Sequence, residues 1–450
     1  RLAFFPDGLP RIPWRLRIAR LLRAWLRVVE DPDWLPWANL RRWRCFVPEY
    51  VRGVRQLAKE IDAHDHPEAL LSDLDRARGL SLALLALHRW SLTFAEIFLR
   101  LLKWEIIFGL RVDASRAHSL ATDLLRQLPG NLTAEFNRAL SSLVGLSETE
   151  RAALLWDFLE KHGHRSPSLD IAEPTWRERP DLLLKLASGG VEGGKNLSPA
   201  DGGTRRALQQ RILSSCRLPA VLRTVWTAVF RATLRLGEEF ALLRENQRHY
   251  WHLVLEQKRR AALKIGAILQ ERGVLETPEL VFELNRRELE KVATGFSLLR
   301  GLNGRLRERQ RARLELAGRP VGLLWDETQA EQQTALADGT KDSFRGLGVS
   351  PGRAKGRVVR VTGPELPSVP NGSVLVLGGL DPGWTPLLGR VAALVTEVGG
   401  ALSHGAILAR EFGVPAVAGV SGARQVFRDG DLVEVDGTVG VVRVLEREGG

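Results

Sequence analysis

The sequence predicts a large all-α domain followed by a compact α/β domain. Apolar residues recur at helical spacing through most of the first 324 positions, and short β-branched runs separated by glycines take over after position 344. Between the two, the polar and aperiodic run Asp326–Asp342 has the composition of a flexible tether. We therefore expect a helical domain over residues 1–324, a linker over 325–343 and an α/β domain over 344–450.

The composition is that of an ordinary globular protein. With 450 residues, 44% of them hydrophobic, the chain is long enough for two or three domains. Its two cysteines provide no disulfide framework, so a reducing cytoplasm is the expected location. Charged residues interrupt the longest apolar stretches before they reach the roughly 20 residues that a membrane-spanning helix needs, so we expect no transmembrane segment.

The net charge of +12 lies almost entirely upstream, and the stretch after Phe344 is close to neutral. A nucleic-acid-binding protein would need basic residues clustered on one face beside stacking aromatics, and no motif supplies them. We expect no nucleic-acid partner.

The upstream region has the pattern of successive helices. Pro13–Val29 places apolar residues on one helical face and arginines on the other, typical of an amphipathic helix packed on a core or lying on an anionic membrane. The 3.6-residue period continues through Leu70–Ile107 and Leu120–Leu155, and Arg205–Gly273 predicts a pair of long helices.

Lys161–Pro180 interrupts the helices with a polar, turn-rich segment. His162 and His164 suggest a metal pair, but no cysteine lies nearby and Asp170 does not complete a site of known spacing. A loop held by Arg165 and Asp170 is the favoured interpretation, and we expect no metal.

Leu186–Thr204 is rich in glycine and predicts a surface loop. Gly194 and Lys195 fall at phosphate-loop spacing, but Asn196 stands where the Mg²⁺-binding Ser or Thr belongs, which argues against a nucleotide site.

Further along, the helical run Glu239–Tyr250 carries Arg244, Glu245 and Arg248, which are able to form i,i+4 pairs on a solvated face. His249 and His252, three positions apart, share one helical face, and no partner for either is evident from the sequence.

The C-terminal region predicts strands over Gly352–Val361 and Ser373–Leu377. Val433–Val435 and Val439–Leu445 are joined across Asp436-Gly437, a strong hairpin signal.

One histidine in this region has a setting suited to phosphoryl chemistry. The buried-strand pattern Val391–Val395 is followed by Gly399-Gly400, which permits a tight turn, and Ser403 stands where a helix N-cap belongs. His404 is then the first helical residue, beside free backbone N–H groups and the positive end of the helix dipole. A neutral imidazole there can attack phosphorus and carry a phosphoryl group. The alternative is a histidine that only caps a turn.

The stretch Thr396–Val420 closely resembles the phosphohistidine segment of the phosphoenolpyruvate-utilising enzymes, and within them most of all the rifampicin phosphotransferases. Gly346–Gly356 and Asp381–Pro386 are similar to the first strand and the Asp-Pro-x-Trp-Thr-Pro segment of that family's swivelling domain. Leu402 stands where phosphoenolpyruvate synthases and pyruvate phosphate dikinases usually place Thr or Cys, which points away from those two enzymes.

The resemblance implies that His404 is the phosphoryl carrier. It also implies a phosphate-binding turn around that histidine, shaped by Thr396, Gly399, Gly400, Ser403 and Arg410.

In this family a separate ATP-grasp domain, with Mg²⁺ and ATP, charges the histidine, and the histidine delivers the phosphoryl group to a hydroxyl. Nothing in these 450 residues resembles that domain, so we expect no cofactor bound by this chain and an ATP-grasp domain or subunit as its partner. A small hydroxylated compound is the expected acceptor, as in the rifampicin phosphotransferases. The alternatives are a subunit of a split enzyme resembling phenylphosphate synthase or phosphoenolpyruvate synthase, a non-catalytic binding remnant, and a basic peripheral-membrane protein.

Two upstream segments resemble elements of the family's central domain. Lys161–Pro180 is similar to its His-Gly-His-Arg element, and Glu239–Tyr250 to its Arg-Glu-x-x-Lys/Arg-Tyr helix. The candidate acceptor-side residues are therefore His162, His164, Arg165, Asp170, Arg244 and Glu245.

Overall fold

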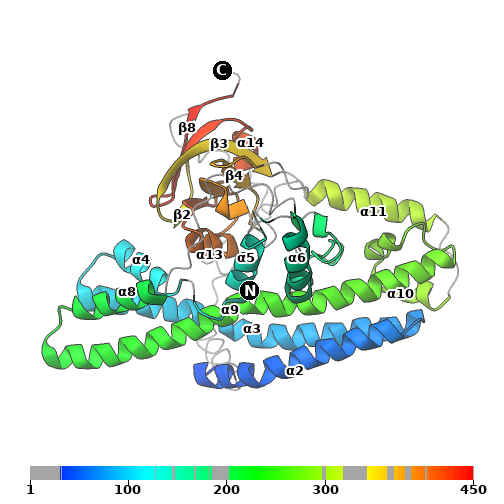
Figure 1. Ribbon diagram of the computed structural model, residues 1–450, viewed down its shortest axis with the longest axis horizontal. Coiled ribbons are helices and arrows are strands. Elements are labelled where there is room, and N and C mark those ends of the chain that lie inside the picture. Colours follow the sequence, from blue (N-terminus) through cyan, green and yellow to red (C-terminus); the bar gives the residue numbers. More distant parts are fainter. Residues whose placement is uncertain are drawn as a thin grey trace, which may run out of the picture.

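The computed structural model describes residues 31–448 except for 32, 127, 144–145, 147, 167–168, 182, 185–201, 296–300, 318–341, 362–368, 381–386 and 401–402. Its helical part is followed by a domain built on one mixed sheet, which confirms the predicted fold class (Figure 1). Some predicted features lie outside the described residues: the helix Pro13–Val29, most of the loop Leu186–Thr204, nearly all of the linker 325–343, and Asp381–Pro386.

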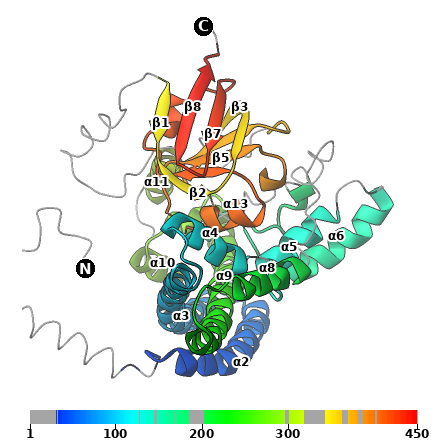
Figure 2. The same cartoon turned by 90° about the vertical axis from the view of Figure 1, so that its left-hand side faces the viewer.

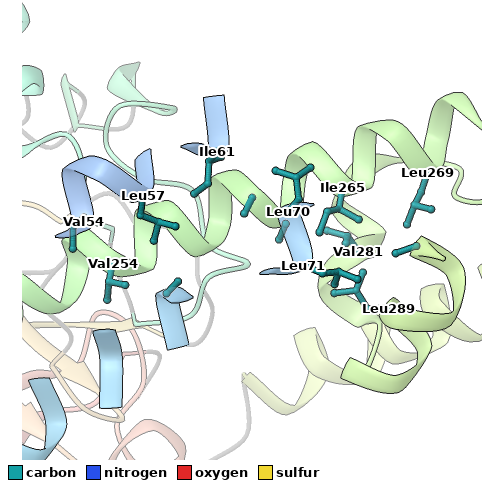
Figure 3. Close-up of a cluster of buried hydrophobic side chains, with 14 of the residues drawn as sticks. Val54, Leu57, Ile61, Leu70, Leu71, Val254, Ile265, Leu269, Val281 and Leu289 are labelled. Carbon is teal, nitrogen blue, oxygen red and sulfur yellow. The ribbon is translucent and has the colours of Figure 1, made fainter. Parts of the chain in front are cut away.

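Three long helices form the base of the molecule: α2 (Pro36–Ala63), α3 (Pro67–Leu110) and α9 (Ala220–Glu271). They run side by side in Figure 1, and buried aliphatic side chains of all three meet in one core cluster. Figure 3 shows part of this cluster, in which Leu57 of α2 lies near Val254 of α9, and Leu70 of α3 lies near Ile265 of α9. Burial of these apolar stripes supplies most of the free energy that holds the helices together.

Shorter helices complete the helical part: α4 (Ala114–Leu124), α5 (Leu132–Ser141), α6 (Glu148–His162), α8 (Gly202–Ser214), the 3₁₀ helix η1 (Pro278–Glu283), α10 (Arg286–Ala293) and α11 (Leu302–Ala317). Two of them begin with an asparagine cap. The side chain of Asn131 accepts hydrogen bonds from the first turn of α5, and Asn285 forms a capping box with Glu288 at the start of α10.

The prediction of two long helices over Arg205–Gly273 is wrong in its lengths. The structure has a helix of 13 residues, α8, and one of 52 residues, α9, which begins directly after Pro219. Apolar periodicity does not reveal where a helix breaks, whereas a proline fixes the start because it lacks the N–H that a helix interior needs.

The expectation that no stretch is apolar enough to span a membrane also needs correction. By length and composition, one described helix, α3, is long and apolar enough to do so. Its buried residues, such as Leu84 and Leu102, pack against other helices of this chain, and a core helix passes the same test.

The C-terminal domain contains an eight-stranded sheet in the order β1-β8-β7-β3-β4-β5-β6-β2. The strands β3 to β6 pair in parallel at its centre, and the remaining pairs are antiparallel. The strand bounds are β1 (Ser343–Arg345), β2 (Leu347–Ser350), β3 (Arg353–Val361), β4 (Val374–Leu377), β5 (Ala393–Thr396), β6 (Ala416–Ala418), β7 (Leu432–Asp436) and β8 (Val441–Glu446). The predicted hairpin across Asp436-Gly437 is confirmed as β7 and β8.

Both faces of the central strands are buried. In β4, Leu375 and Leu377 belong to the cluster that includes the helix α13 (His404–Glu411). Val374 and Val376 point the other way, into a cluster with the short helix α14 (Ala423–Val426) and the strands β7 and β8. This alternation follows from the two-residue period of a strand and explains the uninterrupted apolar run that marks β4 in the sequence.

The two parts of the chain share an apolar cluster. Phe136 and Leu140 of α5 and Phe158 of α6 are buried in the same cluster as Ala406 and Leu408 of α13. Figures 1 and 2 both place α13 at the base of the sheet domain, facing the helical part. The first helix after the predicted carrier turn therefore packs toward the helices that hold the His-Gly-His-Arg element.

We expect the close approach of α9 to η1 to depend on a glycine. A Cβ at position 266 would lie 2.2 Å from the carbonyl oxygen of Pro278, so Gly266→Ala should lower the free energy of unfolding by about 1–3 kcal/mol. Gly79→Ala is the matched control, because nothing lies within 4 Å of a Cβ there and alanine favours the helix by about 1 kcal/mol. Urea unfolding of both variants measures the difference, and equal effects would contradict this account of the packing.

Candidate functional site

The carrier turn begins where β5 ends. Gly399 has φ = 143°, a conformation that side chains disfavour, and a Cβ there would lie 3.0 Å from Ser403 Oγ. At Gly400 a Cβ would meet nothing within 4 Å, so the steric argument made from the sequence holds for Gly399 and not for its neighbour.

The predicted start of α13 is confirmed. Ser403 is the N-cap, and its Oγ accepts a hydrogen bond of 3.3 Å from the N–H of Ala406. His404 is the first helical residue. The next residue, Gly405, packs against Leu380, because a Cβ there would lie 2.7 Å from Leu380 Cβ. His404 therefore stands at the N-terminal end of α13, where backbone N–H groups and the helix dipole favour an anion.

Thr396 and Arg410 lie at different ends of this unit. Thr396 is buried at the end of β5, and its carbonyl accepts a hydrogen bond of 3.0 Å from Val420. Arg410 lies in the last turn of α13, about 9 Å along the axis from His404. It is buried there, and its Nη1 donates to the carbonyl of Val349 at 2.9 Å, which ties the helix to β2. A phosphate-shaping role for either residue stays a prediction.

The sequence analysis missed an ion pair beside the turn. Glu397, which follows β5 directly, accepts hydrogen bonds from Arg424 Nε at 2.8 Å and from the Arg424 backbone N–H at 2.9 Å. Both side chains are largely buried. The pair joins the start of α14 to the strand that leads into the carrier turn, and charge-assisted bonds of this kind fix geometry well.

The second candidate site is a buried cluster of imidazole and guanidinium groups in the helical part. The rings of His164 and His249 meet edge to face with centroids 4.7 Å apart. His162 packs against Phe136 and Phe158. The guanidinium of Arg165 lies 4.8 Å from the Phe136 ring centroid and donates to the carbonyl of Leu132 at 3.2 Å. The structure thus brings three of the six candidate residues, His162, His164 and Arg165, into one cluster, with His164 against α9.

Burial keeps these imidazoles neutral. It lowers the pKa of His162 to about 4 and that of His249 to about 3, with the charge of Arg165 as the next cause in both cases. Burial and the neighbouring His249 lower the pKa of His164 well below its usual range. The pKa of Arg165 falls to about 10 because of burial and then the charge of Arg248, so the guanidinium stays charged at neutral pH. The cluster therefore holds neutral imidazoles beside a fixed positive charge.

Several polar atoms in this cluster have no hydrogen-bond partner among the described residues. They are His162 Nδ1, His164 Nε2, His249 Nδ1 and Arg165 Nε. Buried polar groups are normally satisfied, so such a concentration indicates a place that a polar ligand can occupy.

The face of α9 that carries Arg244 and Glu245 is not solvated, and that alternative is wrong. Glu245 is buried, and it pairs with its neighbour Arg244 at 3.3 Å. His252 Nδ1 accepts a hydrogen bond of 3.4 Å from the N–H of Ser166. His252, like His249, therefore has a partner across the fold that the sequence did not reveal.

His88 of α3 also belongs to this region. Burial lowers its pKa to about 4, with the charges of Arg244 and Arg248 as further causes. No sequence pattern indicated it, because it lies on a different helix more than 150 positions away.

Asp170 does not join the cluster. It is exposed, its carboxylate accepts a hydrogen bond from the N–H of Ala172, and it pairs with Arg313 at 3.6 Å. Arg165 ties the loop to the carbonyl of Leu132 and Asp170 bonds to Ala172 within it, and the buried Arg259 of α9 adds bonds that the sequence did not reveal. Within the described ranges no three His, Cys, Asp or Glu side chains are grouped so as to hold a metal ion.

We expect Gly405 to be the sterically limited position of the carrier turn. Gly405→Ala should displace α13 from Leu380 and lower the midpoint of thermal unfolding, because overpacking costs about 1–3 kcal/mol. Gly400→Ala, with open space around its Cβ, is the control. Calorimetry of the two variants decides the matter, and an equal loss in both would contradict the assignment.

A pH dependence of stability follows from the buried imidazoles. Unfolded His162 binds a proton below about pH 6.5, whereas the folded state does not until about pH 4, so stability is lost as the pH falls through this window. His162→Phe, which cannot titrate, should reduce the slope of unfolding free energy against pH by about 1.4 kcal/mol per unit near pH 5. Urea unfolding at pH 7, 6 and 5 tests this, with the exposed His66→Phe as control. An unchanged slope in the first variant would show that His162 is not buried as a neutral group.

Two segments of the chain match known family models. Residues 369–440 match the PEP-utilising enzyme mobile domain, and residues 145–245 match the rifampicin phosphotransferase fourth domain. The first match contains His404, and the second contains all six candidate acceptor-side residues.

Relatives along the chain agree with these matches. A rifampicin phosphotransferase of Bacillus subtilis is 28% identical over 343 residues, covering 74% of this chain and 38% of that protein. One from a Streptomyces species is 33% identical over 298 residues, covering 64% and 34%. YvkC, an uncharacterized phosphotransferase of Bacillus subtilis, is 31% identical over 313 residues, covering 65% and 36%.

The chain spans about a third of the length of these relatives. Both family models and the relatives point to the same group of enzymes, as does the turn around His404. The chain is therefore related to the phosphoenolpyruvate-utilising phosphotransferases, with a mobile domain after a region similar to the fourth domain of rifampicin phosphotransferase.

Proposed function

We propose that this chain carries a phosphoryl group on His404 and delivers it to a hydroxyl of a small molecule at the buried histidine-arginine cluster. The observation that carries the proposal is the position of His404 as first residue of α13, capped by Ser403, inside the segment that matches the PEP-utilising mobile domain. A helix N-terminus directly after a glycine turn stabilises a phosphoryl group by N–H donors and by its dipole.

In the charging step, ATP and Mg²⁺ are held by an ATP-grasp domain or subunit outside these 450 residues. The imidazole of His404 attacks the β-phosphorus, AMP leaves with the electron pair of the bond to the α-phosphate oxygen, and water takes the γ-phosphoryl group as inorganic phosphate. The product is a phosphohistidine, which stores the phosphoryl group as an N–P bond.

In the delivery step, the N–P bond of His404 breaks as a bond forms from the acceptor oxygen to phosphorus. The proton of the acceptor hydroxyl passes to one of the neutral imidazoles of the cluster, His162, His164 or His249. The charged Arg165 stabilises the negative charge that spreads over the phosphoryl oxygens. The carrier imidazole leaves as a neutral group once it regains a proton.

The position of α13 supports this pairing of carrier and cluster. Ala406 and Leu408, on the turn after His404, share an apolar cluster with Phe136 and Phe158, the two rings that enclose His162. A carrier domain docked in this way faces the acceptor side. Since it must also reach a nucleotide site, the domain has to leave this contact during each cycle.

The acceptor class comes from the relatives. The relatives named rifampicin phosphotransferase cover 74% and 64% of this chain. We infer a bulky hydroxylated compound of that kind, with rifampicin as the first acceptor to test.

The carrier assignment predicts a specific label. With β-phosphate-labelled ATP, Mg²⁺ and a purified ATP-grasp domain from a rifampicin phosphotransferase, the chain should gain an acid-labile, base-stable label, because phosphohistidine hydrolyses in acid. His404→Ala should lose the label, and His66→Ala, at an exposed position, should keep it. Scintillation counting after acid and base treatment measures this, and label retained by His404→Ala would refute the proposal.

A further inference from the structure

Arg259 lies on α9, two helical turns after His252, with its side chain buried. Its Nη1 donates to the carbonyls of Ile171 and Ala172 at 2.8 and 2.9 Å. Its Nε donates to both carboxylate oxygens of Glu178 at 3.0 and 2.8 Å. One guanidinium thus binds both the middle and the end of the polar segment that follows α6.

Glu178 connects Arg259 to the turn that contains His164. Its carboxylate accepts hydrogen bonds from the N–H and the hydroxyl of Thr175 at 2.7 and 3.1 Å. The next two residues then pair with the turn itself: Trp176 N–H donates to the carbonyl of Arg165 at 2.8 Å, and Arg177 N–H to that of Gly163 at 3.0 Å. His164 therefore lies between two carbonyls that the segment after Thr175 fixes.

The turn has little room to move by itself. A Cβ at Gly163 would lie 2.3 Å from the carbonyl oxygen of Leu159, so the backbone passes close to the end of α6. Trp176, which holds the other side, is almost fully buried. Opposite this fixed backbone, the ring of His164 meets the face of α9 that carries His249.

We propose that Arg259 is a positioning residue that sets the ring of His164 against His249, so that α9 holds both the histidine-bearing turn and its partner. The kinetic consequence of this inference rests on the proposed function, whereas its structural consequence does not. Arg259 binds the distal part of the segment, His249 meets the proximal part, and both belong to one rigid helix. The distance between the two imidazoles is thereby fixed by the helix and not by the loop.

Arginine suits this role better than lysine. Its planar fork binds a carboxylate and two carbonyls in one plane, and its face lies 5.2 Å from the ring centroid of Phe282. A lysine would keep the charge beside Glu178 but has a single point of attachment. Loss of the side chain would leave the carbonyls of Ile171 and Ala172 without this donor.

The experiment uses the full chain with Arg259→Ala, Arg259→Lys and the control Arg313→Ala. Arg313 touches the same segment through Asp170 at 3.6 Å, but both side chains are partly exposed, and such a pair contributes little to position. The first readout is the imidazole resonances of His164 and His249 in chain labelled with ¹⁵N-histidine. The second is the rate of His404 charging and the rate of transfer to rifampicin, measured separately.

In Arg259→Ala we expect the ring-current shift between His164 and His249 to shrink, with a smaller change in Arg259→Lys and none in Arg313→Ala. Charging of His404 should be unchanged in all three, while transfer falls roughly 10–100-fold in Arg259→Ala, as misplacement by about 1 Å does. Circular dichroism distinguishes a loss of transfer in a folded variant from a failure to fold. If Arg259→Ala does not fold, Arg259→Lys is used for the same comparison.

The inference is overturned if the resonances of His164 and His249 are unmoved in folded Arg259 variants, or if Arg313→Ala moves them equally. That readout needs no nucleotide and no acceptor. If instead the wild-type chain is never charged on His404, the proposed function fails while the positioning of His164 by Arg259 is still decided by the spectra.

Discussion

The packing of α3 against α9 is the constraint on which the rest of the structure depends. The two helices run antiparallel: near one end the indole N–H of Trp226 donates to the carbonyl of Glu105 at 3.0 Å, and further along Phe98 stacks on Phe240. At Gly109 a Cβ would lie 2.4 Å from the Trp226 ring, so the helices approach as closely as the backbone allows. Because α9 is one helix of 52 residues, a single rigid rod spans this contact, the histidine cluster and η1.

The long helix α9 explains how a cluster of polar side chains is held within an apolar core. Glu245, His252 and Arg259 recur every seven residues on α9, and all three are buried. Two turns separate each from the next, so they face the same side. The polar segment after α6 crosses this face and finds its partners there, which removes the imidazoles from water and keeps them neutral at physiological pH. Burial is what keeps these imidazoles neutral beside the charged Arg165.

The C-terminal sheet domain has a different structural requirement. Under the proposed function, the domain has to hold the N-terminus of α13 in a fixed direction while the domain moves. Its sheet is buried on both faces, and α13 is tied at its end to β2 through Arg410 and at its start to Leu380 through the close approach of Gly405. The helix α13 is therefore fixed within its domain, and the motion proposed for catalysis belongs to the domain as a body.

The sequence by itself determined the features that depend on neighbouring residues. The Ser403 cap, the start of α13 at His404, the positive φ at Gly399 and the hairpin at Asp436-Gly437 follow from local backbone preferences, which a short window contains. The tertiary structure alone decided which polar residues are buried together. His249 and His252 gain partners, Asp170 lies at the surface and Arg259 holds the segment from α9, because these outcomes depend on how α9 meets a loop some 80 positions away. The burial and the pKa of these side chains depend on that contact between the helix and the loop, and no local sequence pattern encodes them.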